Sequence, residues 1–413
     1  MTVTANNTGA AFSLPPEPGT TAEEIVERAR AIAYSLIDRQ AETEERTCYA
    51  PDTHEAFAAA GLYRILVPKR YGGLELGLDT FFKVVVALTR GCPSTGWMYC
   101  LGAAHAHAVG TLFEERTQAE VFAGGEFIAP ATVAPTGTAV PAPDGGWTVT
   151  GTWNYCSGAP YSTHLVAHAL VTPEDGGEPY PVMFVVPRAD YEVLDDWGHH
   201  LGLKGSGSNS VRVAGAHVPA HRVLPMHLSQ ATVTGGTPGL ALHGNSLYGG
   251  GPLSVMVLED AALALGMGQA ALDAYEELMR SRQTLFPPIL PRTADPDFQY
   301  WYGEAAGLLQ AAESALNGAI GQWQQYAERG PAYFTPAREL RIVLACREVI
   351  RMCWRAVESY LYPTAGSSAV KHGERMERIW RDLSMQHSHA GIAVFLNSHA
   401  NREFSKAHFG IGS

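Results

Sequence analysis

The chain has few cysteines and no block of basic residues, and each absence argues against a class of function. Its 413 residues include six scattered cysteines, with no CxxC pair and no metal-ligand spacing. The six are Cys48, Cys92, Cys100, Cys156, Cys346 and Cys353. This usage is typical of reduced thiols, so we expect a cytoplasmic protein without a bound metal. The formal net charge of −12 argues against binding to nucleic acid phosphates.

Long apolar runs and nucleotide-binding motifs are missing as well. No stretch of eighteen or more residues is apolar throughout, so we expect no membrane span. Residues 1–20 are polar and rich in proline and glycine, which predicts a flexible N-terminus and not a signal peptide. There is no GxGxxG after a strand pattern, no Walker motif and no nucleophile elbow. A nicotinamide cofactor is therefore not expected on this chain.

Residues 21–125 have the periodicity of helices. Thr21 precedes two acidic residues, which is the pattern of a capped helix start. The apolar residues Ile25, Ala29 and Leu36 then recur at helical spacing. A second helix is predicted from residue 50 and ended by Gly61, and two more over 77–92 and 94–113, the last so apolar that we expect it to be buried.

Residues 126–230 follow a different pattern. The stretch 145–156 alternates, and β-branched runs at 163–172, 180–187 and 210–219 are bounded by turn residues. This pattern predicts an antiparallel β unit, either a barrel or a sandwich.

Residues 231–413 return to helices after a glycine-rich link. Four long helices with apolar faces are predicted over 258–282, 298–328, 336–362 and 374–401, which suits a four-helix bundle that also packs between subunits. The predicted fold class is α+β, with an N-terminal helical domain (21–125), a middle β-barrel or sandwich (126–230) and a C-terminal four-helix bundle (231–413).

Four stretches in this frame resemble a known family. They are "CPSTGWMYCLGAAHAH", "GWTVTGTWNYCSG", "WGHHLGLKGSGSNSVRVAGAHVPAHRV" and "MERIWRDLSMQHSH". Their order and spacing resemble the acyl-CoA dehydrogenase fold, and more closely its branch of two-component flavin-dependent monooxygenases. The resemblance covers the chain from about Glu23 to Phe409.

The resemblance implies the oxygenase component of such a system. It would take reduced FMN (FMNH2), or alternatively reduced FAD, from a separate NAD(P)H-dependent flavin reductase. It would then form a C4a-hydroperoxyflavin with O2 and hydroxylate an organic substrate, aromatic or polycyclic, in secondary metabolism. A homotetramer or a homodimer is expected.

The resemblance also implies flavin-binding residues. In this family the segment that matches Trp153, Asn154, Tyr155, Cys156 and Ser157 lies against the flavin ring, with Ser157 near the N5 atom. The residues alone favour a β-hairpin whose aromatic side chains cover a core.

His389 is the first candidate catalytic residue. It follows Asp382 by seven residues, or two helical turns, so we expect both on one helix face. The resemblance implies that His389 bonds to the flavin or the substrate and assists proton transfer, which suits a group that titrates near neutral pH. The alternative is a packed or solvent-facing helical histidine.

His105 is the second candidate, on the apolar stretch 94–113. The resemblance places it in the substrate pocket, while a satisfied core histidine is the alternative. His107 points to another helix face and is interpreted as structural.

Three residues are predicted to hold the flavin phosphate. The resemblance implies this role for Arg282, commonly across a subunit interface, and for Ser367 and Ser368 beside it. A guanidinium suits a phosphate because it stays charged and donates two hydrogen bonds. The Gly205–Asn209 loop is rich in glycine and hydroxyl groups and could hold an anion.

Other functions stay open at this point. Acyl-CoA dehydrogenases commonly use a glutamate base on a C-terminal loop, and no acid lies between Tyr362 and Gly373. The alternatives are a dehydrogenase-like flavin oxidoreductase, an N- or S-oxygenase with the same flavin chemistry, and a catalytically silent scaffold. The segment Thr284–Tyr302 could be an entrance loop or a plain connection.

Overall fold

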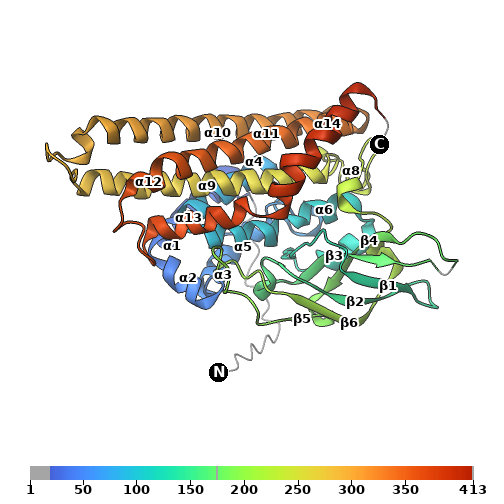
Figure 1. Ribbon diagram of the computed structural model, residues 1–413. Helices are drawn as coiled ribbons and strands as arrows, with labels where there is room; N and C mark the ends of the chain where they lie inside the picture. Colours follow the sequence, from blue (N-terminus) through green and yellow to red (C-terminus); the bar gives the residue numbers. More distant parts are fainter. Residues whose placement is uncertain (1–18, 174, 412–413) are drawn as a thin grey trace.

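The computed structural model describes residues 19–173 and 175–411 (Figure 1). Seven short helices come first: α1 (Ala22–Leu36), α2 (Gln40–Arg46), α3 (Pro51–Ala59), α4 (Gly77–Gly91), α5 (Pro93–Ala103), α6 (His105–Leu112) and α7 (Glu115–Val121). Seven strands follow: β1 (Gly137–Pro141), β2 (Trp147–Trp153), β3 (His164–Val171), β4 (Tyr180–Pro187), β5 (Glu192–Val193), β6 (Val211–Val218) and β7 (Val223–Leu224).

The C-terminal part is helical again. It comprises α8 (Pro238–His243), α9 (Pro252–Ser281), α10 (Pro296–Glu328), α11 (Pro336–Arg355), α12 (Tyr362–Ala365), α13 (Arg375–His387) and α14 (Ala400–Phe409). Two π-helical segments, Ala356–Leu361 and Gly391–His399, interrupt it. Figure 1 shows the long helices as one layer, with the sheet and the N-terminal helices below it.

These elements change type close to the predicted boundaries at residues 125 and 230. Whether the three parts are independent domains stays a prediction. The predicted flexible segment 1–20 lies largely outside the described residues.

The first helix starts as its sequence indicates. The Thr21 hydroxyl accepts a hydrogen bond from the backbone of Glu24 (3.2 Å), and the Glu24 carboxylate accepts one from the backbone of Thr21 (2.8 Å). This reciprocal capping box satisfies two backbone donors that a helix start otherwise leaves free.

Two predicted helices are interrupted, both near candidate site residues. The stretch 94–113 forms α5 and α6, because the His107 amide bonds three residues back to Ala104 (3.0 Å). The stretch 374–401 breaks after His387, where the amide of His389 bonds three residues back to Gln386 (2.9 Å). Such tight turns end the regular four-residue ladder.

The strands form one curled sheet, in the order β5-β6-β2-β1-β3-β4-β7. It is mixed, because β1 pairs in parallel with β3, with Gly137 opposite Ala169. The prediction of a purely antiparallel unit is therefore wrong at this pair. The long connection between β1 and β3, which contains β2, makes a parallel pair possible.

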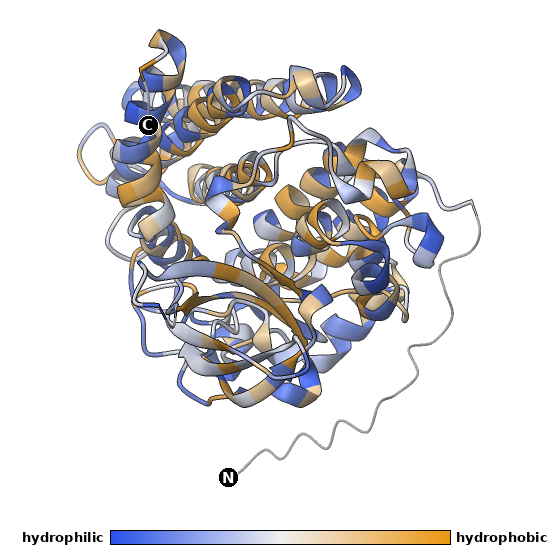
Figure 2. Ribbon diagram, turned by 90° about the vertical axis from the view of Figure 1, so that its right-hand side faces the viewer, coloured by the Kyte–Doolittle hydropathy of each residue, from blue (hydrophilic) through white to orange (hydrophobic). Residues whose placement is uncertain are grey.

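Strands β3 and β4 are buried on both faces, whereas β1, β2 and β6 alternate between buried and exposed residues. Leu165 and Ala167 of β3 face a core enclosed by the sheet itself, whereas Val166 faces the helices. Burial on both sides explains why these strands are continuous apolar runs instead of alternating ones. In Figure 2 the apolar colour follows the strands and the helices behind them.

Helix α9 runs through the centre and packs on α4, α5, α11 and α13. A Cβ on Gly266 would lie 2.5 Å from Thr89 Cβ and 2.9 Å from the Val86 carbonyl, so the contact with α4 needs glycine there. Among the described residues, α9 is the one helix long and apolar enough to cross a membrane, and 78% of its most apolar window is buried within the protein. That burial is typical of a core helix.

All six cysteines are described and none forms a disulfide. Five are buried and Cys48 is partly exposed.

Candidate active site

The candidate site residues fall into two groups along α9. His105 and His389 lie near the acids of its first half, and Ser157 is joined to His389 through Trp97. Arg282 and Ser368 lie just beyond its C-terminal end. At 1.5 Å per residue, the helix separates Glu259 from Ser281 by about 33 Å.

Ser157 belongs to a chain of buried hydroxyl groups. The Trp97 indole N–H donates to Ser157 Oγ (3.0 Å), which lies 2.7 Å from Ser208 Oγ. Ser208 Oγ in turn lies 2.6 Å from Ser206 Oγ. All four side chains are buried, so the chain holds Ser157 in one orientation.

The backbone around Ser157 fixes this arrangement. Gly158, with φ of 92°, donates from its amide to the Gly207 carbonyl (3.1 Å), which joins the turn after β2 to the loop 205–209. Only glycine adopts this φ without strain. The hydroxyls of that loop are therefore turned inward to Ser157, and its predicted role as an anion loop is not supported by their position.

The four residues before Ser157 do not share one surface. The Trp153 indole is buried and donates to the His168 carbonyl (2.8 Å), and the Cys156 thiol is buried too. A ligand can therefore meet these two only through their backbone. Asn154 Oδ1 accepts from Ser210 Oγ (3.0 Å), and the exposed Tyr155 ring leans on Trp197 and His200.

His389 lies beside this chain, but not as predicted. Because α13 ends at His387, His389 does not share a helix face with Asp382, and that spacing argument is wrong. The Asp382 carboxylate is buried and accepts hydrogen bonds from the Leu203 amide (2.5 Å) and Ser94 Oγ (3.1 Å). Both partners are protein groups, so this carboxylate joins α13 to the loop before β6 and to α5. The exposed His389 ring stands edge-on to the Trp97 ring at 5.9 Å between centroids.

His105 is buried and oriented by one backbone group. Its Nδ1 lies 2.7 Å from the Ala129 carbonyl oxygen, which can only accept, so Nδ1 carries the proton. Its Nε2 lies 4.0 Å from Glu259 Oε2. Burial lowers the pKa of His105, so the neutral ring presents Nε2 as an acceptor. His107 is held differently, by the Leu247 carbonyl (2.8 Å).

Two acids of α9 were missed by the sequence analysis. Burial raises the pKa of Glu259 well above its usual range, with the neighbouring Asp260 adding to the shift. Burial likewise raises the pKa of Asp260 to about 6. Asp260 lies near His389, since a Cβ on Gly391 would be 3.9 Å from Asp260 Oδ2 and 3.0 Å from His389 Nδ1. The sequence does contain a sign of these two residues, because an acid pair in an otherwise apolar helix is unfavourable unless it has a role.

A basic corner lies at the other end of α9. Arg282 Nη1 donates to Ser368 Oγ (2.7 Å), while Ser367 is exposed beside it. The buried Arg292, which the sequence analysis missed, donates to the Ala365 carbonyl (3.0 Å), and its Nε has no partner among the described residues. Two guanidinium groups and two hydroxyls suit a phosphate.

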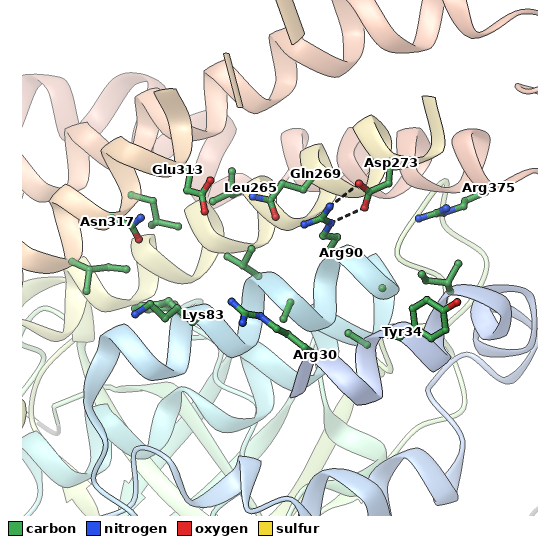
Figure 3. A pocket seen from close by; sticks show the side chains of 18 of the residues that line it. Arg30, Tyr34, Lys83, Arg90, Leu265, Gln269, Asp273, Glu313, Asn317 and Arg375 are labelled. Atoms are coloured by element: carbon green, nitrogen blue, oxygen red, sulfur yellow. Dashed lines mark hydrogen bonds and ion pairs between the residues drawn. The ribbon is translucent and has the colours of Figure 1, made fainter. Parts of the chain in front are cut away.

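A groove lies elsewhere, between α1, α4, α9 and α10, with a cavity volume of about 630 Å³ (Figure 3). None of the predicted site residues lines it. Its Arg90 is paired with Asp273 (2.6 and 2.7 Å) and its Arg375 with Glu277 (2.6 Å). Gln269, Glu313 and Asn317 also line this groove. No group of three or more metal-binding side chains occurs in residues 19–173 and 175–411.

Comparisons with known proteins agree with this arrangement. Residues 20–115 match the acyl-CoA dehydrogenase N-terminal domain, and residues 258–394 match the acyl-CoA dehydrogenase C-terminal domain. The flavin-dependent monooxygenase oxygenase subunit HsaA of Rhodococcus jostii is 30% identical over 369 residues, covering 88% of this chain and 94% of the relative. The chain belongs to the flavin-dependent monooxygenases of the acyl-CoA dehydrogenase fold.

Two further members of this family are similar. The oxygenase component of p-hydroxyphenylacetate 3-hydroxylase from Acinetobacter baumannii is 25% identical, covering 86% of this chain and 82% of that one. The structure of XiaF from Streptomyces sp. in complex with FADH2 and glycerol superposes with a TM-score of 0.84 at 26% identity, covering 95% and 96% of the two chains. The predicted fold class and enzyme class are thereby confirmed, and the dehydrogenase and scaffold alternatives are set aside.

The residues present fit a flavin in two places. At one end, the fixed Ser157 hydroxyl and the backbone of the turn after β2 offer polar groups to the edge of a ring. At the other end, the basic corner offers charge to a phosphate. Helix α9 spans about 33 Å from Glu259, which faces His105, to Ser281, which adjoins the basic corner.

Proposed function

We propose that this chain is the oxygenase component of a two-component system, binding reduced flavin from a separate reductase and transferring one oxygen atom from O2 to an aromatic substrate. The observation that carries the proposal is the buried Trp97–Ser157–Ser208 chain beside His105 and His389. The p-hydroxyphenylacetate hydroxylase relative supports an aromatic substrate and a separate reductase. N- or S-oxygenation by the same chemistry is the second candidate.

The bound flavin, once reduced, supplies the electrons that activate O2. The side chains of this protein do the rest. Ser157 accepts the Trp97 N–H, so its own proton is available to Ser208 or to a ligand. His389 sits exposed at the edge of the site and can exchange a proton with water. His105 Nε2 is the buried acceptor.

We propose that the basic corner of one subunit serves the flavin of another, in a homodimer or homotetramer. The separation along α9 supports this arrangement. The exposed apolar residues Leu285 and Phe286, just after Arg282, also suit a subunit contact. The segment Thr284–Tyr302 is only partly a loop, since α10 begins at Pro296.

The flavin itself is tested by anaerobic titration. FMNH2 is the flavin predicted from the sequence, while XiaF was solved with FADH2. We expect either reduced flavin to bind more tightly than its oxidised form, because an oxygenase component must take it from solution. Equal affinity for oxidised and reduced flavin would argue for a tightly bound cofactor and against a separate reductase.

The role of His389 is tested by measuring how much product forms for each flavin oxidised, which is the coupling of the reaction. In His389→Ala, we expect less product per flavin oxidised and more hydrogen peroxide released. Unchanged coupling would remove His389 from the mechanism. The predicted location in the cytoplasm, where reduced flavin and reductase would both be found, stays a proposal.

A further inference from the structure

Asp260 is an acid of the central helix α9 whose carboxylate has no ordinary partner. It is partly buried, and its side chain makes no hydrogen bond or ion pair with the part of the chain that the structure describes. Other acids that turn away from solvent, such as Glu339 and Asp382, accept hydrogen bonds from protein donors. A carboxylate without such donors is unfavourable, so Asp260 is a candidate for a role outside the fold.

The group that Asp260 faces is the ring of His389. Gly391 lies between them, since a Cβ there would be 3.9 Å from Asp260 Oδ2, 3.0 Å from His389 Nδ1 and 3.3 Å from His389 Cε1. The carboxylate and the Nδ1 edge of the ring therefore border the same small gap, which glycine keeps open. His389 Nε2 lies farther from Gly391 than any of these atoms.

Gln386 fixes the acid and the histidine relative to each other. Its side chain donates from Nε2 to the Asp260 carbonyl (2.7 Å), and its own carbonyl accepts from the His389 amide (2.9 Å). Gln386 is fully buried, so one rigid side chain ties α9 to the tight turn that ends α13. The approach of Asp260 to His389 is thus set by the core and not by a surface loop.

Among the described residues, His389 is the group that favours the charged form of Asp260. Burial raises the pKa of Asp260 to about 6, and the charge of His389 acts in the opposite direction. The other ionisable side chains that interact with Asp260 are Glu259, Cys100 of α5 and Cys346 of α11. None of these is a cation, and burial raises the pKa of both thiols, which keeps them protonated.

We propose that Asp260 is the positioning residue of His389. The carboxylate attracts the Nδ1–H of the ring across the gap at Gly391, which leaves Nε2 as the nitrogen that meets a ligand. It also stabilises the protonated ring, so that His389 holds its proton until the site takes it. A carboxylate orients a proton-exchanging histidine in this way in many enzymes. The inference rests on the proposed function, in which His389 exchanges a proton, and names the acid that acts through it.

The pairing is tested by an infrared titration of the full chain without flavin, from about pH 4 to about pH 9. The carboxyl band that disappears in Asp260→Asn reports the protonation of Asp260. His389→Ala removes the opposing charge, so the midpoint of this band should rise by about one pH unit above the wild-type value. His389 is exposed, so this variant is expected to fold. An unchanged midpoint would overturn the proposal.

A second measurement follows the hydrogen peroxide released when protein loaded with FMNH2 meets O2. We expect His389→Ala and Asp260→Asn each to speed the release by about threefold or more, and the double variant to release it no faster than His389→Ala. This non-additivity is what a residue that acts only through His389 must show. Independent, multiplying effects of the two substitutions would mean that Asp260 acts elsewhere, and would also overturn the proposal.

Glu339→Gln is the matched control, because Glu339 is a buried acid that is bonded to Ser254 at the start of α9, away from His389. It should leave the midpoint of the Asp260 band at its wild-type value. The infrared titration uses no flavin and no O2. Its failure is therefore distinguishable from failure of the flavin titration that tests the proposed function.

Discussion

Two buried acids, Glu259 and Glu339, are expected to have opposite effects on the stability of this enzyme. Glu259 has no hydrogen-bond partner among the described residues, while the equally buried Glu339 accepts from the backbone and the hydroxyl of Ser254. Replacing the first removes an unsatisfied group, whereas replacing the second leaves the Ser254 amide without its acceptor, since the Ser254 hydroxyl can still donate to the Gly251 carbonyl.

Glu259→Leu is therefore expected to stabilise the protein by about 1–2 kcal/mol, and Glu339→Leu to destabilise it by about 1–3 kcal/mol. Thermal unfolding of both variants beside wild-type protein measures this. A loss of stability in Glu259→Leu as large as in Glu339→Leu would mean that Glu259 is a structural group.

At the scale of residues, the family pattern pointed to three side chains whose surroundings the structure now shows. His105 and His389 lie near the acids of α9, and Ser157 is joined to His389 through Trp97, while the roles of all three stay predictions. The argument that placed His389 on a helix face was wrong. Glu259 and Arg292 could not be found in the same way, because their surroundings come from distant parts of the sequence. Glu259 faces His105, which is 154 residues away, and Arg292 donates to Ala365, which is 73 residues away. The sequence shows that an acid interrupts an apolar helix, but not that it lacks a partner.

At the scale of elements, His168 joins strand β3 to two loops. Its Nδ1 donates to the Thr132 carbonyl (2.8 Å) and its Nε2 accepts from the Leu228 amide (3.1 Å). Both bonds exist together only for the neutral ring. Burial accordingly lowers the pKa of His168 to about 4.

This histidine makes stability depend on pH. Its folded pKa, about 4, lies below the ordinary value of 6.5, so the contribution is complete above pH 6.5 and is lost as the pH falls toward 4. Between pH 7 and pH 5 the loss is about 2 kcal/mol. Urea unfolding of His168→Gln at both values should show a drop smaller by that amount than wild-type protein shows. An equal drop would contradict the neutral-ring account.

Helices and strands were predicted well where periodicity was strong, and less well where hydrogen bonding breaks. The starts of α1 and α3 follow from Thr21 and Pro51. The breaks at Ala104 and Ser388 have no proline to mark them, because they arise from tight turns within otherwise helical sequence. The parallel β1–β3 pair depends on tertiary packing, which strand patterns do not encode.

At the scale of the whole molecule, His105 and His389 lie near the first half of α9 and the basic corner lies beyond its C-terminal end. If each flavin is shared between subunits, two inactive variants should repair one another. Ser157→Val impairs the ring site, and Arg282→Glu reverses the charge of the corner that Ser368 completes.

Co-assembling these two variants in equal amounts is expected to restore about one quarter of wild-type turnover, since half of the dimers are mixed and half of their sites are intact. Each variant assembled alone is the control. Activity no higher than the mean of the two controls would show that each flavin is held within one subunit.

The central claim is that this enzyme uses reduced flavin to place an atom of O2 on an aromatic substrate. The most direct measurement loads the protein anaerobically with reduced flavin, mixes it with ¹⁸O2 and a panel of aromatic compounds, and analyses the products by mass spectrometry. The account predicts a hydroxylated product that carries one ¹⁸O atom and depends on the protein. Oxygen derived from water, or reoxidation of flavin that yields only hydrogen peroxide with every compound, would contradict it.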